Sequence, residues 1–287
     1  MSSTLERNAV AVGELLVGEG PAVVIGGPVR LRAHPPEADV HQVLRQARGA
    51  AGPVLAEPRT AADLPAIASL ADAAVVGASW TRDIPLVRAA AGLGLPVVVE
   101  RRAGASPEEW LGLAAYCAAE GDGRVVLCEG GRPDLALLRA VRAASGRPVL
   151  ADVSADAGLS AAAVAAGADG LVAGGPAALR AAEEAVTVVG ALLRPESPAT
   201  IPECRAAIDR VDAALATLLE RRAALAGTVQ RLKPVGGFAG RDLARERALV
   251  ARMAVRAPSL GAARLAPVMN AVIEAGLHLA EEQARHP

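Results

Sequence analysis

One stretch, IPECRAAIDRVDAALATLLERRAALAGTVQRLKPVGGFAGRDLARER at residues 201–247, decides how the C-terminal part of this chain folds. Apolar side chains recur along it at steps of three and four residues: Ile208, Val211, Leu215, Leu218, Leu219, Leu225, Val229 and Leu232. That period is typical of an amphipathic α-helix, which we predict from Pro202 to Lys233. A proline suits the first turn of a helix, and Pro234 with the glycines behind it ends this one.

A helix of about thirty residues is roughly 45–50 Å long. The rest of this segment adds two shorter predicted helices, residues 241–256 and 262–284, and no strand. Because two short helices cannot cover so long a rod, we expect a second copy of the chain to lie beside it. The segment is therefore predicted to be an all-α, three-helix domain that forms a homodimer.

The charged residues of these helices could form a pocket. Arg222 and Lys233 are eleven residues apart, or three turns, so they point the same way within about 20°. Arg205 points about 100° away from Arg222, so in an intertwined dimer it would enter the partner's pocket. The second helix adds three more charged residues, Asp242, Arg245 and Glu246. Several cations with one or two acids favour a small dianion that also carries hydroxyl groups.

The N-terminal part alternates between apolar runs and helical patterns. A hairpin at residues 9–17 precedes seven strand-like runs, which begin with 22–29 and continue with 54–57, 73–77, 96–100, 124–128, 148–152 and 170–173. Helical patterns separate them, at 38–50, 61–70, 83–93, 107–119, 133–144 and 158–166, and a last one follows at 177–193. Continuous apolar strands joined by helices indicate a parallel sheet that is covered by helices. We predict an α/β TIM-like barrel.

Composition limits the domain organisation and the partners. We divide the chain into a barrel at 1–194, a linker at 195–201 and the helical domain at 202–287. A net charge of −1 and 1% aromatic residues favour neither nucleic acid nor an anionic membrane as a partner. No apolar run is long enough for a membrane span, and three scattered cysteines suit a reducing compartment. A cytoplasmic protein is expected.

Four motifs of the helical segment resemble the all-helical chorismate mutases: Cys-Arg-x-x-Ile-x-x-Val-Asp at 204–212, Leu-Leu-Glu-Arg-Arg at 218–222, Val-x-x-x-Lys at 229–233 and Arg-Asp-x-x-Arg-Glu-Arg at 241–247. The resemblance implies an intertwined homodimer that converts chorismate to prephenate by a Claisen rearrangement without a cofactor. It also implies that Arg222, Lys233 and Arg245 bind the substrate carboxylates and ether oxygen. Arg205 would reach the partner's site, and Glu246 with the backbone at Asp242 would hold the ring hydroxyl.

The third helix departs from that family. The positions of the family's serine and of its glutamine, which hydrogen-bonds the ether oxygen, are Gly276 and Ala280 here. Losing such a donor costs on the order of 3–4 kcal/mol. Gln283, one turn further on, is the candidate replacement. The alternatives are a mutase of 4-amino-4-deoxychorismate in a specialised pathway, a lyase acting on isochorismate, or a non-catalytic regulatory or partner-binding protein of aromatic biosynthesis.

The N-terminal part resembles type I DAHP synthases, the enzymes that begin the shikimate pathway. The similarity rests on six motifs in matching order: Val-Ile-Gly-Gly-Pro at 24–28, Gly-Ala at 77–78, Pro-Val-Val-Val at 96–99, Glu-Glu-Trp-Leu at 108–111, Leu-Cys-Glu at 127–129 and Gly-Ala-Asp-Gly at 167–170. Fusion to a mutase domain agrees with it, since both activities would serve aromatic amino acid biosynthesis. An enzyme of that pathway is therefore a possible partner.

The catalytic positions that this resemblance implies are nevertheless replaced. The metal ligands become Val29, Ala155 and Gly174, the phosphoenolpyruvate lysine becomes Glu100, and two arginines become Ser79 and Gly130. The loop that binds the sugar phosphate is missing, together with what looks like one whole βα unit, since only about 25 residues separate Val29 from Val54. We therefore expect a degenerate, inactive barrel without a metal, in which Glu100 and Glu129 are ordinary strand-end charges.

Overall fold

The computed structural model describes residues 8–50, 52–193, 198–233, 235 and 237–285. The chain forms two compact units, residues 1–210 and 211–287, so the boundary between them falls inside one long helix. The proposed linker at 195–201 lies partly outside the described residues, and the domain boundaries that we drew from the sequence stay predictions. Within the described residues, no helix is both long and apolar enough to cross a membrane.

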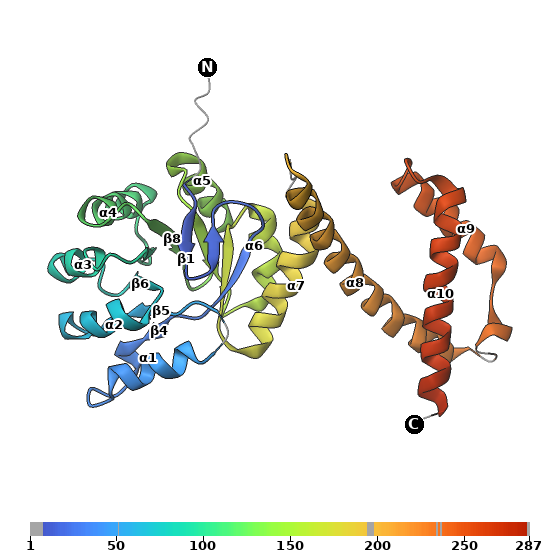
Figure 1. Ribbon diagram of the computed structural model, residues 1–287, viewed down its shortest axis with the longest axis horizontal. Coiled ribbons are helices and arrows are strands. Elements are labelled where there is room, and N and C mark those ends of the chain that lie inside the picture. The colour runs from blue at the N-terminus through green and yellow to red at the C-terminus, as the bar shows by residue number, and fades with distance from the viewer. Residues whose placement is uncertain (1–7, 51, 194–197, 234, 236, 286–287) are drawn as a thin grey trace, which may run out of the picture. The chain divides into compact units, whose positions relative to one another are not determined.

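The first unit is built on one parallel sheet (Figure 1). Its strands are β3 (Val23–Gly26), β4 (Val29–Arg30), β5 (Leu55–Glu57), β6 (Ala73–Val76), β7 (Val97–Glu100), β8 (Val125–Glu129), β9 (Val149–Asp152) and β10 (Gly170–Ala173). From β4 to β10, each strand pairs in parallel with the next one in the chain. The predicted parallel sheet is confirmed.

The sheet curls because its two outermost strands belong to one stretch of chain. Only Gly27 and Pro28 separate β3, which pairs with β10, from β4, which pairs with β5. A proline has no N–H to donate to a ladder, so the first strand is divided at this point. The two halves together occupy one place in a TIM-like barrel that has seven places among the described residues. The sequence had suggested a barrel one βα unit short of eight, and this count agrees with it.

Seven helices accompany the sheet in the described part of this unit, and Figure 1 shows them around it. They are α1 (Val40–Arg48), α2 (Leu64–Leu70), α3 (Ile84–Ala91), α4 (Pro107–Glu120), α5 (Leu135–Ser145), α6 (Ser160–Ala166) and α7 (Gly175–Leu193). Short 3-10 turns, η1 (Leu31–Ala33), η2 (Ala61–Asp63) and η3 (Ala157–Leu159), complete the connections. Asp39, Asp83, Ser106 and Asp134 each accept a backbone hydrogen bond at the start of a helix.

Two buried clusters hold this unit together. One lies between the sheet and the helices, and the other lies inside the barrel, with Ile25, Val98 and Leu150 among its members. Val10, Val12 and Val17 of the hairpin β1 (Val10–Val12) and β2 (Leu15–Val17) belong to the inner cluster. Gly13 and Gly18 of the hairpin approach Pro53 and Pro148, which precede β5 and β9. The hairpin therefore covers the amino-terminal end of the barrel and leaves the opposite end open.

The C-terminal helices are α8 (Ile201–Leu232), α9 (Leu243–Arg256) and α10 (Gly261–Arg285), with a 3-10 turn η4 (Phe238–Gly240) before α9. Asp242 caps α9 by accepting from the Arg245 backbone N–H at 2.9 Å. Each helix lies within two residues of its predicted position. Nearly the whole apolar face of α8 is exposed, including Leu225 at 63% and Leu232 at 80%.

Candidate functional site

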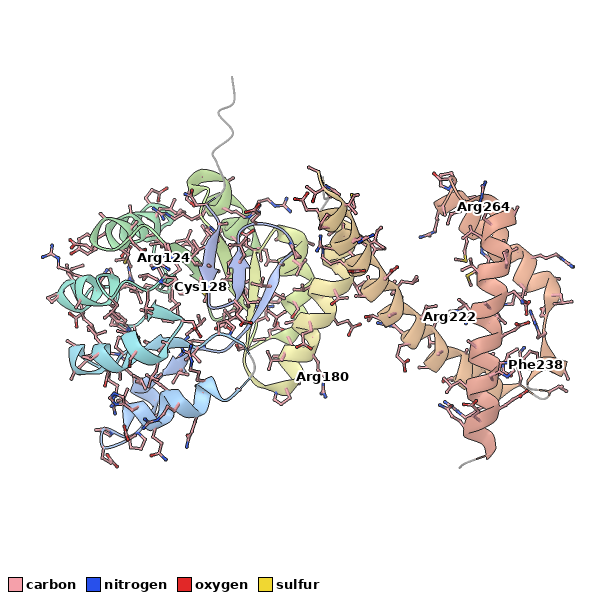
Figure 2. All side chains as sticks on the ribbon, in the orientation of Figure 1. Arg124, Cys128, Arg180, Arg222, Phe238 and Arg264 are labelled. Atoms are coloured by element: carbon pink, nitrogen blue, oxygen red, sulfur yellow. The ribbon has the colours of Figure 1, made fainter. Side chains whose placement is uncertain are left out.

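The second unit contains a pocket of about 170 Å³ among α8, the turn η4, α9 and α10. Five of the predicted site residues line it: Arg222, Lys233, Asp242, Arg245 and Glu246. Figure 2 labels Arg222 on α8, where that helix lies beside α10. The structure thus brings these five residues together around one pocket, and their roles stay predictions.

The helical period places Arg222 of α8 and Lys233, which directly follows α8, in this pocket. The Arg222 guanidinium donates from Nη1 to the carbonyl oxygen of Val272 on α10, at 3.2 Å. Three turns later, Lys233 Nζ donates to the carbonyl oxygen of Gly240, at 2.8 Å. Both cations are therefore half-buried and oriented, and both keep donor capacity for a ligand, because a guanidinium has five N–H donors and an ammonium three.

The loop between α8 and α9 is held against both neighbouring helices. Gln230 of α8 accepts a hydrogen bond from the Gly237 backbone N–H at 2.9 Å, and Gly237 has a φ of 64°, which suits glycine. The Phe238 ring packs on His278 of α10, with 5.0 Å between the ring centroids (Figure 2 labels Phe238). These contacts hold Gly237 and Phe238 against α8 and α10.

Arg241 was not among the predicted site residues, although it opens the Arg-Asp-x-x-Arg-Glu-Arg motif. Its guanidinium contacts both carboxylate oxygens of Glu246, at 2.7 and 3.1 Å, and also bonds to Glu274 at 3.1 Å and Asn270 at 2.7 Å. The hydrogen bonds from Arg241 lower the pKa of Glu246 below its ordinary value, and the charge of Lys233 adds to this effect. Glu246 is therefore a carboxylate that is already ion-paired, and a ligand hydroxyl would share it with Arg241.

Charge in the pocket is strongly unbalanced. The pocket is also lined by Gln230 and Arg252, which the sequence analysis did not select. Arg252 lies outside the recognised motifs. The lining then contains five cations (Arg222, Lys233, Arg241, Arg245 and Arg252) against two carboxylates (Asp242 and Glu246), an excess of three positive charges. A pocket with this excess attracts a small ligand that carries more than one negative charge.

Other predicted site residues do not line this pocket. Arg205 is exposed on α8, and Gln283 is exposed on α10, where its Oε1 atom lies near Gly227. Gly276 does line the pocket, and a Cβ atom there would lie 3.7 Å from Arg222 Nη1. Ala280 is not among the lining residues. In the chain taken alone, Gln283 therefore does not replace the missing donor.

The open end of the barrel holds a buried ion cluster. Arg30, at the end of β4, donates to Glu57 at 2.5 Å and to Glu100 at 2.7 and 3.2 Å. Trp80 Nε1 donates to the other oxygen of Glu57 at 2.9 Å, and the Ala78 backbone N–H donates to Glu100 at 3.1 Å. Burial lowers the pKa of Arg30, but the hydrogen bonds and charges of Glu100 and Glu57 more than offset burial, so the pKa is raised. We call Arg30, Glu57 and Glu100 the mouth cluster.

A second pair lies beside the mouth cluster. Arg101 contacts both oxygens of Glu129, each at 2.5 Å, and the Glu129 side chain is 1% exposed. Glu100 and Glu129 are thus structural strand-end charges, as expected, but they are buried and ion-paired. A cavity of about 780 Å³ opens above them, lined by Arg32, Ser79 and Asp152 among others.

The residues at this end do not fit the divalent metal that the family resemblance implies. Val29 is in β4 and Gly174 directly follows β10, and neither offers a metal-binding side chain. The carboxylates of Glu57 and Glu100 are already bound to Arg30. Within the described residues, no group of three His, Cys, Asp or Glu side chains could hold a metal ion. No catalytic step through a metal is therefore derived for this barrel.

Comparisons with known proteins agree with the two-part architecture. The model of the DAHP synthetase I family matches residues 27–174, which is more than half of the chain. The chain belongs to the DAHP synthetase I family. Residues 204–281 match a second model, chorismate mutase type II. This family member therefore carries a C-terminal chorismate mutase domain, which supports an isomerase activity in broad terms.

Solved structures confirm the fold of the barrel. The DAHP synthase of Thermotoga maritima matches with a TM-score of 0.53 and 24% identity over 59% of this chain and 64% of that one, so less than two thirds of that enzyme's length is covered. A truncated form of the 3-deoxy-D-arabino-heptulosonate 7-phosphate synthase from Thermotoga maritima matches with a TM-score of 0.52 and 25% identity, over 59% of this chain and 80% of that one. A search of curated proteins gives no significant match.

Proposed function

We propose that the helical domain catalyses the Claisen rearrangement of chorismate, or of a close analogue, to prephenate or its counterpart. One observation carries the proposal. Arg222, Lys233 and Arg245 line a single pocket within a segment that matches the chorismate mutase type II model. Chorismate is a dicarboxylate, and the excess of positive charge in this pocket suits two carboxylates.

The reaction needs no nucleophile and no cofactor, so the residues act by positioning and by charge. Arg222 and Arg245 would hold the carboxylates, which fixes the enolpyruvyl arm over the ring in its reactive conformation and removes freedom before the bond changes. Lys233 Nζ would turn from the Gly240 carbonyl to the ether oxygen, where negative charge grows as the C–O bond breaks. Glu246 with Arg241, and the backbone at Asp242, would hold the ring hydroxyl.

We also propose that the working form is a homodimer in which Arg205 completes the partner's pocket. The exposed apolar face of α8 supports a second copy packed along it, because residues such as Leu215, Leu225 and Leu232 are left in solvent in the chain alone. Arg205 does not line the pocket of its own chain, which is consistent with a role in the partner's. We expect the protein to work in the cytoplasm.

For the barrel, we propose a structural rather than a synthetic role. The support is the mouth cluster, which ties Glu57 and Glu100 to Arg30 at the place where the relatives bind substrate and metal. The protein mixed with phosphoenolpyruvate, the sugar phosphate and a divalent metal should consume no phosphoenolpyruvate above the rate without protein. Measurable consumption would contradict this role.

The substrate is identified by incubating the purified protein with chorismate and, separately, with 4-amino-4-deoxychorismate. We expect the ultraviolet absorbance of one of them to fall, with a product of unchanged mass that mass spectrometry and chromatography assign as the rearranged isomer. Formation of pyruvate instead would favour a lyase. If both compounds remain intact at high protein concentration, the domain is non-catalytic and the proposal fails.

A further inference from the structure

A second pocket lies on the barrel, between α3 and α4 at the open end. Neither the mouth cluster nor the activity proposed for the helical domain gives this pocket a role. It encloses about 360 Å³, which is within the range of small-molecule sites. One wall is a stripe along α4 made by Trp110, Leu113 and Tyr116, and Ile84 of α3 forms the facing wall. The chain has only four Trp, Tyr and Phe residues in total, so two of them in one pocket is a notable concentration.

The aromatic side chains in the pocket wall are held by hydrogen bonds to residues outside the pocket. Trp110 is 2% exposed, and its Nε1 donates to the carbonyl oxygen of Val99 at 3.0 Å. The Tyr116 hydroxyl accepts from Arg88 Nε at 3.1 Å. The aromatic faces are thus held in place while the space beside them stays open. Such a preformed apolar space favours a ligand with a flat hydrocarbon ring.

Some polar groups of the pocket already have hydrogen-bond partners, and others have none. Both carboxylates are engaged: Glu109 accepts two bonds from Arg102 Nη2, at 2.8 and 3.0 Å, and Glu100 belongs to the mouth cluster. Three side chains at the same pocket keep a donor without an acceptor. Arg82 is exposed at the rim, and Thr81 is 9% exposed with a hydroxyl that bonds to no other described residue. The third donor is Arg102 Nε, which is buried and has no hydrogen-bond partner among the described residues. An acceptor for these donors is therefore missing.

From this arrangement we propose that the pocket between α3 and α4 binds a small carboxylate with one aromatic ring. The ring lies between Ile84 and the Leu113 and Tyr116 side chains of α4, which the buried Trp110 supports from behind. The carboxylate accepts from the Thr81 hydroxyl and the Arg82 guanidinium. Because Glu109 is already paired with Arg102, the pocket makes no demand for an ammonium group on the ligand. Arg82 forms no salt bridge among the described residues, although its charge, after that of Arg102, helps to lower the pKa of Glu109. Charge complementarity comes from Arg82 together with the unpartnered Nε of Arg102.

The test uses 3-phenylpropionate as the probe, with 3-phenylpropanol as its neutral counterpart. Titration calorimetry and tryptophan fluorescence should give saturable binding of the acid, with a Kd on the order of 1 mM or tighter. The alcohol should bind about tenfold more weakly, since it lacks the charge-assisted bonds. Absence of saturable binding of the acid, or equal binding of the alcohol, would overturn the proposal.

Matched variants of the full chain locate the site. Arg82→Gln and the isosteric Thr81→Val should each weaken the acid about five- to tenfold, whereas Arg45→Gln, which removes an exposed arginine from α1, should leave binding unchanged. Leu113→Trp fills the pocket and should abolish binding of acid and alcohol. Circular dichroism checks that each variant folds.

The same variants separate this site from the helical one. Leu113→Trp should leave chorismate turnover as in the wild type, so the two proposals fail independently. If binding of the acid survives Leu113→Trp but is lost in Arg222→Ala, the probe occupies the helical pocket and the assignment to α3 and α4 is wrong.

Discussion

Arg30 balances the buried charges at the open end of the barrel. Its guanidinium is the counter-ion of two carboxylates that are only 4% and 8% exposed. A methyl group on Gly77 would overlap Glu57, so the backbone is also fitted to this cluster.

Replacing Arg30 by methionine should therefore destabilise the barrel by about 2–3 kcal/mol, because two buried carboxylates lose their partner. The loss is smaller than for a fully buried pair, since the Arg30 side chain is 38% exposed. Urea unfolding followed by tryptophan fluorescence measures this, since Trp80 and Trp110 both lie in the barrel unit. Adding Glu57→Gln and Glu100→Gln should restore most of the loss. An Arg30→Met variant as stable as the wild type would contradict the role given to the cluster.

Ala280 stands at the position where the resemblance to the chorismate mutases places a glutamine. If chorismate is the substrate, Ala280→Gln should supply a donor toward the ether oxygen and raise kcat at least about tenfold. Ala280→Leu, similar in bulk but without a donor, is the control. A lower rate with Ala280→Gln than with the wild type would indicate a substrate whose reacting group does not need this bond.

Among the elements, α8 was the most predictable and the loop after it the least. The three-turn spacing of Arg222 and Lys233 follows from the helical period, and both residues line one pocket. The links from Arg241 to Glu274 and Asn270 join residues about thirty positions apart, so no local pattern reveals them. The mouth cluster escaped prediction for the same reason, since Arg30 and Glu100 are seventy residues apart.

The strands show a similar limit. Each apolar run gave a strand close to its predicted place, because buried parallel strands are apolar throughout. The division of the first run into β3 and β4 follows from Pro28, which the sequence analysis had included inside a single strand. β3 pairs with β10 and β4 pairs with β5. This pairing depends on how the whole sheet curls, so the residues of the first run alone do not predict it.

Charged substitutions on the apolar face of α8 should prevent two copies of the chain from associating. Leu215→Asp with Leu225→Asp places carboxylates in the proposed helix–helix contact, so the dimer should dissociate more than about a hundredfold more readily. Sedimentation velocity measures the mass. Leu16→Asp, an equally exposed leucine of the hairpin, should remain dimeric. A charged α8 variant that stays dimeric would place the interface elsewhere.

At the scale of the whole molecule, one chain joins a barrel whose open end carries the mouth cluster to a helical domain with a cation-rich pocket. The two parts match two families that serve aromatic biosynthesis. The helical pocket and the open end of the barrel share no lining residue, so each can be altered without changing the residues of the other.

Steady-state turnover of chorismate, or of whichever analogue is consumed, tests the function proposed for the helical pocket most directly when Lys233→Ala is compared with Arg264→Ala. Both remove one cation from the helical domain, but Arg264 is exposed on α10 and does not line the pocket (Figure 2). We predict that Lys233→Ala lowers kcat at least about a hundredfold, the cost of losing a donor at the developing charge, and that Arg264→Ala matches the wild type. Equal turnover in the two variants would contradict the account.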